Sequence, residues 1–598
     1  MMSACGVFAL HEGGGCTTIK EKEAGAMKTL WSDTVDRDRV LQEYPRPQMR
    51  RESCCILNGL WDYAITDSDQ PPEKWEGSIL VPFSPEAPLS GVNRALQPGQ
   101  YLWYRRALCL KSEQGRLLLH FGAVDQIATV YLNGKPLGGH TGGYTAFTVD
   151  LTGEVTGDDI LLVRVRDDTD RSTLARGKQK TKRGGIWYTP QSGIWQTVWA
   201  EEVPKSYIKN LRIQPQFDEG AVEITVESED DAPCAVEFDG AVYEGRSNAK
   251  ITVPVPMFRP WSPETPYLYE FSASLGADRV QSYFAMRKVE VRPDENGVPR
   301  IHLNGRPYFM HGVLDQGYWP DGLYTAPCDE ALILDIQSMK AMGFNTLRKH
   351  MKTEPMRWYY HCDRLGMLVW QDMPCGGAEE YKLPVVSLPL VTKRHRKDSD
   401  YAAFGRQDEQ GRRRYYAELT QLVEQLRNVP SVVLWCPFNE GWGQFDAEKA
   451  VALIRTLDPE RLIDHASGWH DQGIGQLQSL HVYFTKYRHR PDRRGRATIL
   501  SEYGGYHLKV RGHCWNGRSF GYRAIRDPET LLKAYEELML GQILPALEQG
   551  LSAAIYTQLS DVEDELNGLW TYDRTVQKLP SAAVRNVNLQ LTGWNQRR

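Results

Sequence analysis

Two glutamates stand directly after apolar runs that have the length of buried strands. Residues 431–438 read Ser-Val-Val-Leu-Trp-Cys-Pro-Phe and lead through Asn439 into Glu440, and residues 497–500 read Ala-Thr-Ile-Leu and lead through Ser501 into Glu502. One such glutamate is commonly a cap or an ion-pair partner, because a carboxylate is costly in a core. Two of them match the chemistry of glycoside hydrolysis. In that reaction one carboxyl group protonates the leaving oxygen, and the other attacks the sugar or activates water.

The elements that would position this pair begin after about residue 291, where strand-like runs alternate with amphipathic helices. The expected strands are 307–313, 344–348, 367–372, 431–438, 461–465, 480–484, 497–502 and 550–558, and the expected helices are 329–342, 354–365, 410–427, 446–457 and 528–547. Eight strands, mostly followed by helices, predict a (β/α)8 TIM barrel, whose active site forms where the strands end. A doubly wound sheet is the rival fold, but it usually carries a glycine-rich loop after its first strand, and this chain has none.

Two all-β stretches precede the barrel. The first has strand candidates and an Asn133-Gly134 hairpin signal without helical periodicity, which predicts a β-sandwich of the jelly-roll type. The second holds five or more short strands and predicts an immunoglobulin-like β-sandwich. The expected multidomain organisation is an N-terminal extension, partly disordered, over 1–44, a jelly-roll domain over 45–202, an immunoglobulin-like sandwich over 203–291 and the barrel over 292–598.

Composition excludes several other classes of protein. The 598 residues exceed what a single core organises, and the net charge of −5 does not favour nucleic acid as a partner. The 11 cysteines form no CxxC pair, which is typical of a reducing compartment and argues against a structural zinc site. No apolar run of 18 residues or signal-peptide pattern is present. We therefore expect a cytoplasmic protein without a membrane partner, a metal or a cofactor.

The chain resembles glycoside hydrolase family 2, which includes β-galactosidases, β-glucuronidases and β-mannosidases. The resemblance covers nearly the whole chain from about residue 45 and rests on motifs at 103–106, 130–134, 192–195, 261–269, 343–348 and 362–366. It implies that Glu440, preceded by Asn439, is the acid/base and that Glu502 is the nucleophile. Asn439 would bind the sugar 2-hydroxyl. Double displacement with retention would follow, with the two carboxyl groups about 5–5.5 Å apart.

Five further residues are candidates for the substrate site. By the resemblance, Arg348 would keep the nucleophile ionised, although a structural ion pair is the alternative. Tyr483 follows the sixth expected strand and could hydrogen-bond the nucleophile. His350 and Asp372 follow strands two and three and would bind sugar hydroxyls, or else be satisfied residues of the barrel mouth. Trp442 is an aromatic wall or a core residue.

An acidic loop follows the eighth expected strand. It contains Asp561, Glu563, Asp564 and Glu565, which could bind hydroxyls or a cation, or form a solvated loop. Family glucuronidases carry an Asn-x-Lys motif in this region, whereas residues 564–570 contain no lysine. An acidic loop would also repel a sugar carboxylate, so glucuronidase activity is disfavoured.

The identity of the sugar stays open at this stage. The segments 192–197 and 314–319 also depart from the large β-galactosidases. β-Galactosidase ranks first, α-L-arabinosidase second and β-mannosidase third. The family habit of walling the site with first-domain loops predicts exo action on an oligosaccharide or glycoside, with residues 83–91 as the expected wall. A homo-oligomer is also possible.

Two other classes of protein stay open. One is a non-catalytic carbohydrate-binding protein, which would have no need of both glutamates. The other is a metal-dependent hydrolase using His311, His350, His465 and Asp315, but these residues lack ligand spacing of the HExxH type.

Overall fold

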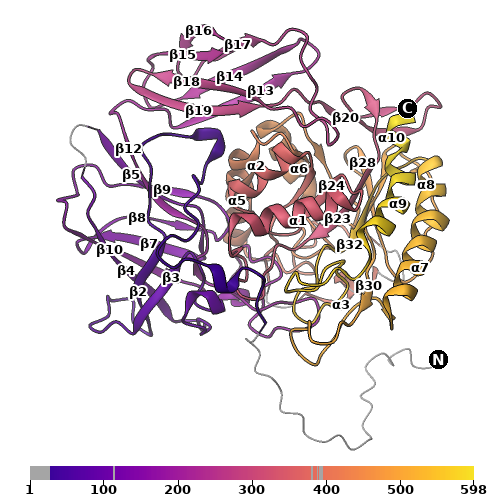
Figure 1. Cartoon of the computed structure of the whole chain (residues 1–598), viewed down its shortest axis with the longest axis horizontal. Coiled ribbons are helices and arrows are strands. Elements are labelled where there is room, and N and C mark those ends of the chain that lie inside the picture. Colours follow the sequence, from indigo (N-terminus) through magenta and orange to yellow (C-terminus); the bar gives the residue numbers. More distant parts are fainter. Residues whose placement is uncertain (1–26, 112–114, 379–380, 387, 390–394, 598) are drawn as a thin grey trace, which may run out of the picture.

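The computed structural model describes residues 27–111, 115–378, 381–386, 388–389 and 395–597. Residues 1–26 of the N-terminal extension, which was expected to be partly disordered, lie outside these ranges. Two β-sandwiches pack against a large α/β barrel, one beside it and one above it (Figure 1). The predicted fold class, β-sandwich domains followed by a TIM barrel, is confirmed.

The first sandwich consists of two main antiparallel sheets that enclose an apolar core. The sheet orders are β1-β12-β5-β9 and β3-β2-β4-β10-β7-β8. Their bounds are Cys55–Ile56 (β1), Gly59–Thr66 (β2), Gly77–Val81 (β3), Tyr101–Leu108 (β4), Arg116–Phe121 (β5), Ile127–Leu132 (β7), Lys135–Thr141 (β8), Phe147–Asp150 (β9), Asp159–Arg166 (β10) and Val198–Val203 (β12). Asn133 and Gly134, with φ of 51° and 81°, form the tight turn between β7 and β8. Asparagine and glycine tolerate this left-handed conformation, and the predicted hairpin is confirmed.

The second sandwich has sheets β13-β14-β17 and β16-β15-β18-β19. The strands are Asn210–Gln216 (β13), Ala221–Glu227 (β14), Pro233–Phe238 (β15), Ala241–Arg246 (β16), Lys250–Pro254 (β17), Tyr269–Leu275 (β18) and Asp278–Phe284 (β19). In β14, Val222, Ile224 and Val226 are fully buried while the residues between them are half-buried. This alternation is what a sheet with a single apolar face requires.

The barrel is an eight-stranded parallel sheet in the order β27-β26-β25-β24-β23-β32-β29-β28. The strands are Met310–Asp315 (β23), Thr346–Lys349 (β24), Leu368–Asp372 (β25), Val432–Cys436 (β26), Leu462–Ile463 (β27), Leu477–Val482 (β28), Ala497–Gly504 (β29) and Leu551–Thr557 (β32). Around them lie Asp329–Ala341 (α1), Met356–Leu365 (α2), Glu409–Leu426 (α5), Ala447–Leu457 (α6), Pro528–Leu538 (α7), Leu544–Glu548 (α8) and Ser581–Thr592 (α9). Among the described residues, no helix is long and apolar enough to span a bilayer.

The barrel is less regular between its fifth and sixth strands than the sequence pattern predicts. β27 has only two residues, and no backbone pairing joins it to β28 in the described part of the chain. Instead, the Ser479 hydroxyl on β28 donates to Asp464, just after β27, at 2.7 Å. The expected strand 480–484 is therefore shifted, because β28 ends at Val482 and leaves Tyr483 at the mouth.

Two helical features also differ from expectation. The single helix expected over 528–547 contains a π-helical turn, Met539–Ile543, before α8. Pro545, near the start of α8, has no N–H for the α-helical ladder, and a shift of hydrogen-bond register accommodates it. Helix α9 was not expected, and it packs against α1 and β23.

Buried polar contacts join the three parts. Arg51 forms ion pairs with Glu201 of the first sandwich at 3.0 Å and with Asp278 of the second at 2.8 Å. The second sandwich meets the barrel at Asp363, whose carbonyl and carboxylate accept from Trp261 and Tyr283, each at 2.8 Å. Buried ion pairs and hydrogen bonds thus connect both sandwiches to each other and the second sandwich to the barrel.

Candidate active site

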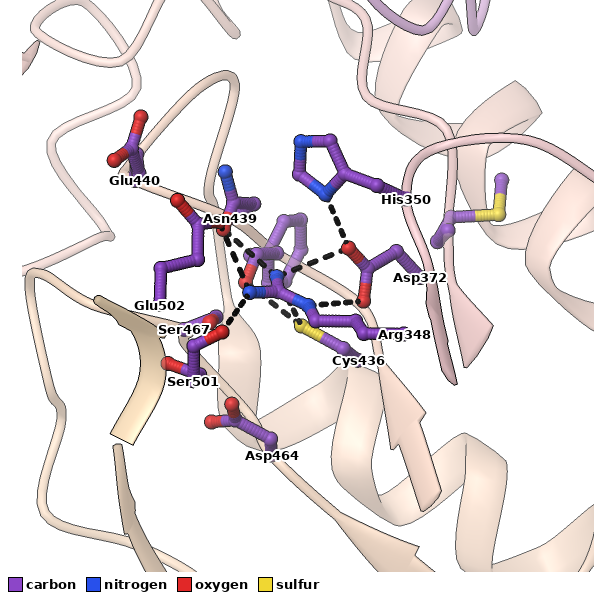
Figure 2. A network of polar contacts seen from close by, with 12 residues as sticks. Arg348, His350, Asp372, Cys436, Asn439, Glu440, Asp464, Ser467, Ser501 and Glu502 are labelled. Carbon is purple, nitrogen blue, oxygen red and sulfur yellow. Dashed lines mark hydrogen bonds and ion pairs between the residues drawn. The ribbon is translucent and has the colours of Figure 1, made fainter. Parts of the chain in front are cut away.

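Arg348, the third residue of β24, organises the barrel mouth (Figure 2). Its guanidinium donates to Glu502 Oε1 at 3.0 Å and to Asn439 Oδ1 at 2.8 Å. It also pairs with Asp372, at the end of β25, at 2.9 Å. A guanidinium holds several donors in one plane, so this single fully buried side chain of strand two orients groups from strands three, four and seven.

Glu502 lies in β29 and is almost fully buried. Its second oxygen accepts a short hydrogen bond from the Tyr483 hydroxyl, which in turn lies 3.0 Å from Thr557. Burial by itself would raise the pKa of Glu502, but the charges of His481, Arg348 and His350 outweigh burial and hold that pKa well below its usual value. The carboxylate is therefore ionised at neutral pH.

Glu440 follows β26 and has a left-handed backbone with φ of 51°. A side chain of this size seldom adopts that conformation, which here turns the carboxyl group toward the mouth. His481 Nδ1 lies 2.9 Å from Glu440 Oε1 and 3.6 Å from Glu502 Oε2. Burial and the nearby charge of Glu502 raise the pKa of Glu440, although His481 opposes this effect.

The two carboxyl groups face one another across the mouth. An oxygen of each glutamate and a nitrogen of His481 all lie within 4.8 Å of one another. Retaining glycosidases keep their two carboxyl groups ~5–5.5 Å apart, whereas inverting enzymes keep them ~6.5–9.5 Å apart to admit a water. The same three groups have a geometry that could hold a cation. However, Arg348 lies 3.0 Å from Glu502 and disfavours a divalent ion there.

His350 and Asp372 are brought to the same place. His350 Nδ1 lies 2.6 Å from Asp372 Oδ2, while its Nε2 has no partner among the described residues. Asn439 Nδ2 is likewise buried without a partner in the described part of the chain. Unpaired buried polar atoms beside a carboxyl pair are suited to bind substrate hydroxyls.

Trp442 lies two residues after Glu440, and its ring meets an aromatic group from the first sandwich. The ring centroid of Trp187 lies 5.2 Å away, and that of Tyr381 lies 6.4 Å away. Trp442 is therefore at the mouth. By contrast, Trp370 on β25 is fully buried inside the barrel and donates to Met310.

Residues 172–192, here called the bridging segment, connect β10 with Gly193–Ile194 (β11) and cross from the first sandwich to the barrel mouth. Arg176 donates to the carbonyls of Gly377 and Ala378 at 3.2 and 2.7 Å. Gln191 accepts from the Tyr324 amide at 3.1 Å. In the expected wall, residues 83–91, Phe83 and Ala87 are buried against Leu323, which lies in the loop after β23.

The acidic loop after β32 is bound by this segment. Arg183 pairs with Glu563 at 2.7 Å and with Asp564 at 3.0 Å, and the Tyr188 hydroxyl donates to Glu565. Asp561 pairs with Lys578 at 2.6 Å. All four acids are buried, so the solvated-loop interpretation is wrong. Their carboxylates hold protein groups in place.

The residues of the metal-hydrolase alternative do not gather at one point. His311 lies 3.0 Å from Asn588, Asp315 pairs with Lys349 at 2.6 Å, and His465 contacts Asp471 at 3.1 Å. Only His350 of that set lies beside the glutamate pair, and its Nδ1 is engaged by Asp372.

Two residues of the mouth escaped sequence reasoning. His481 was passed over because it lies inside the sixth strand, whose bounds were misplaced. Lys178 lies on the bridging segment, and only the unbroken alternation of cations at 176, 178, 180 and 182 marks it in the sequence. Neither position can be connected with residues hundreds of positions away without the fold.

Comparison with known proteins agrees with this arrangement. The description "Glycosyl hydrolases family 2, TIM barrel domain" matches residues 297–507, and "Glycosyl hydrolases family 2" matches residues 206–287. A putative β-glucuronidase of Formosa agariphila is 25% identical over 465 residues, which are 67% of this chain and 50% of that protein. A β-galactosidase of Actinobacillus pleuropneumoniae is 25% identical over 72% of this chain and 46% of its own length. The chain thus spans about half the length of these curated relatives.

A solved structure has the same fold. The β-galacturonidase of Eisenbergiella tayi bound to galacturonate superposes with a TM-score of 0.68 at 19% identity, covering 91% of this chain and 99% of that one. At that identity the likeness concerns the fold alone. The two family matches cover parts of both the second sandwich and the barrel, and they agree with the motifs found in the sequence. The chain therefore belongs to glycoside hydrolase family 2.

Proposed function

We propose that the protein is a retaining, exo-acting glycoside hydrolase that removes a terminal non-reducing sugar by double displacement, without a cofactor. The observation that carries this proposal is the pair of buried glutamates, whose oxygens lie within 4.8 Å of each other while their pKa values are displaced in opposite directions. One carboxyl group is therefore suited to donate a proton, and the other to attack.

In the first step Glu502 attacks the anomeric carbon while Glu440 protonates the glycosidic oxygen, and the aglycone leaves. Arg348 and Tyr483 hold the Glu502 carboxylate ionised and oriented for attack. The unpartnered amide of Asn439 is suited to the 2-hydroxyl, where a hydrogen bond strengthens as the oxocarbenium-like transition state forms. His350 Nε2 is suited to a second hydroxyl.

In the second step Glu440, now ionised, takes a proton from water, which attacks the glycosyl–enzyme bond and releases Glu502.

Exo action is supported by the bridging segment, which brings Trp187 against Trp442 and covers one side of the mouth. We propose a β-galactoside as the first substrate to test, followed by an α-L-arabinoside and a β-mannoside. Acidic counterparts belong in the same panel because relatives carry the names β-glucuronidase and β-galacturonidase.

The test is a panel of p-nitrophenyl glycosides, assayed with the wild type, Glu502→Ala and Glu440→Ala. Turnover of one glycoside should fall below detection in Glu502→Ala. In Glu440→Ala it should fall by about 10²–10⁴-fold on poor leaving groups and much less on good ones, which need little protonation.

Azide separates the two roles. It should rescue Glu440→Ala with a product of retained configuration, and rescue of Glu502→Ala should give only the inverted azide. Equal losses on good and poor leaving groups in Glu440→Ala would contradict its role. A folded wild type that binds sugars but turns over no glycoside would favour the non-catalytic carbohydrate-binding alternative.

A further inference from the structure

Lys178 is a lysine at the barrel mouth whose side chain is largely buried. The residue belongs to the bridging segment and is 6% exposed. Its Nζ lies 5.7 Å from the ring centroids of both Tyr188 and Trp442. Its charge is close enough to act on Glu440, Glu502 and His350, the groups that would surround the reacting sugar.

This ammonium group has no oxygen partner within the described residues. The other three buried lysines of that part of the chain each bind a carboxylate: Lys349 binds Asp315, Lys352 binds Glu354, and Lys578 binds Asp561, at 2.6, 2.8 and 2.6 Å. Two aromatic faces offset only part of the cost of burying a cation. An anionic ligand would supply the missing partner.

The acidic loop does not supply an anionic partner for Lys178, because its carboxylates already bind other protein groups. Arg183 binds Glu563 and Asp564, and Tyr188 donates to Glu565. The repulsion of a sugar carboxylate that the bare sequence predicts is therefore opposed by a cation on the same side of the mouth.

An uncompensated Lys178 would also work against the proposed chemistry. A cation near Glu440 favours the ionised carboxylate, whereas the first step needs the protonated acid. A bound anion would cancel this effect at the moment of catalysis. The depth of Lys178 in the site indicates which sugar it would contact. In an exo-acting enzyme the buried end of the site holds the terminal sugar, and the aglycone faces solvent.

We infer that Lys178 binds the carboxylate of a uronic acid at the terminal position and selects acidic over neutral sugars. This inference rests on the proposed function and names its substrate class. The selecting cation comes from the first sandwich and not from residues 564–570 after β32, which contain no lysine.

The test compares neutral and acidic members of matched pairs: p-nitrophenyl β-D-galactoside with β-D-galacturonide, and β-D-glucoside with β-D-glucuronide. The wild type should favour the acidic member of the pair it accepts. Lys178→Met should lower the acidic-to-neutral ratio of kcat/KM by about 100-fold, the size expected for one charge-assisted hydrogen bond. Lys178→Arg should retain more of the ratio than Lys178→Met, because it keeps the charge.

Lys180→Met is the matched control. Lys180 lies on the same segment with its Nζ 4.6 Å from the Trp187 ring, and its removal takes away the same charge. The ratio should stay within about threefold of wild type. Inhibition by free uronic acids relative to their neutral hexoses should follow the same order among the variants, which gives a readout independent of turnover.

Two results would overturn the inference while leaving the hydrolase proposal intact. One is a wild type that favours the neutral member of every pair. The other is a Lys178→Met variant that loses acidic and neutral turnover by the same factor. A failure of the proposed function would give a different result, because a folded wild type would then turn over no glycoside of the panel.

Discussion

At the scale of single residues, Glu440 and Glu502 lie in one buried site, and yet their pKa values are displaced in opposite directions. Both are buried, which raises the pKa of any carboxyl group, but only Glu502 has Arg348 and Tyr483 bound directly to its carboxylate. The Glu440 carboxyl group instead has its hydrogen bond from His481 and feels the negative charge of Glu502. The proposed division of roles therefore follows from which of the two carboxylates Arg348 reaches.

This arrangement predicts a bell-shaped dependence of kcat/KM on pH. Activity should fall on the acidic side as Glu502 gains a proton and on the alkaline side as Glu440 loses one. His481 lowers the pKa of both carboxyl groups, in each case against the larger effect of burial. Replacing it with a neutral side chain of similar reach, His481→Gln, should raise both pKa values and move the whole profile alkaline by about one pH unit.

The measurement is kcat/KM for a p-nitrophenyl substrate between pH 4 and 10. A loss of activity without displacement of either limb would mean that His481 only packs against the site. His489→Gln serves as control, because this histidine contacts Tyr487 outside the mouth and should leave both limbs in place.

At the scale of elements, much of the architecture was readable from periodicity. Strand β25 and helices α1 and α5 follow their expected bounds closely, because alternation and helical period report directly which face is buried. The fifth and sixth barrel strands were misplaced. There a side-chain bridge, Ser479 to Asp464, replaces backbone pairing, and no local pattern encodes such a bridge.

The residues of the candidate site likewise fall into those that a local sequence pattern locates and those that depend on long-range contacts. Arg348, Asp372, Glu440, Glu502 and Tyr483 were found because each lies at or near a strand end, which a one-dimensional pattern can locate. The bridging segment was not found, because its position depends on pairs such as Arg183 with Glu563, 380 residues apart. Long-range pairing of this kind leaves no local signature.

The bridging segment yields a prediction of its own. Arg183→Ala leaves the carboxylates of Glu563 and Asp564 buried without their cation, which should cost about 2–3 kcal/mol and lower the Tm. Arg94→Ala is the matched control, since its pair with Glu76 is largely exposed and should contribute less than about 1 kcal/mol. Thermal unfolding followed by circular dichroism compares them. Equal Tm values for the two variants would show that the segment is held by other contacts.

At the scale of the whole molecule, Arg51 joins the two sandwiches through two carboxylates, Glu201 and Asp278, both deeply buried. Arg51→Met should leave both acids unpaired, cost about 3–5 kcal/mol and separate the unfolding of the first sandwich from that of the rest. Calorimetry should then resolve more than one transition. Arg246→Met removes an exposed pair with Asp231 and should leave the wild-type profile unchanged.

The same junction should respond to acid. Burial opposes ionisation of Glu201, but Arg46, His120 and Arg51 lower its pKa from 4.5 to about 2. A carboxyl group whose pKa is lower in the folded protein stabilises it above the unfolded value, and this stabilisation is lost as the pH falls toward the folded value. Wild-type stability should therefore decline between pH 4.5 and about 2, and Arg51→Met should decline less steeply. Parallel pH profiles would contradict this account.

The crossing of the bridging segment from one part of the chain to another bears on how such enzymes diversify. Bond cleavage is assigned here to the barrel, whereas the choice of sugar is assigned to a stretch of a neighbouring sandwich. A chimera that joins this barrel to the first sandwich of a relative would then inherit the mechanism from one parent and the preference from the other. Substitutions in the bridging segment would then change the substrate preference while the catalytic residues of the barrel stay the same.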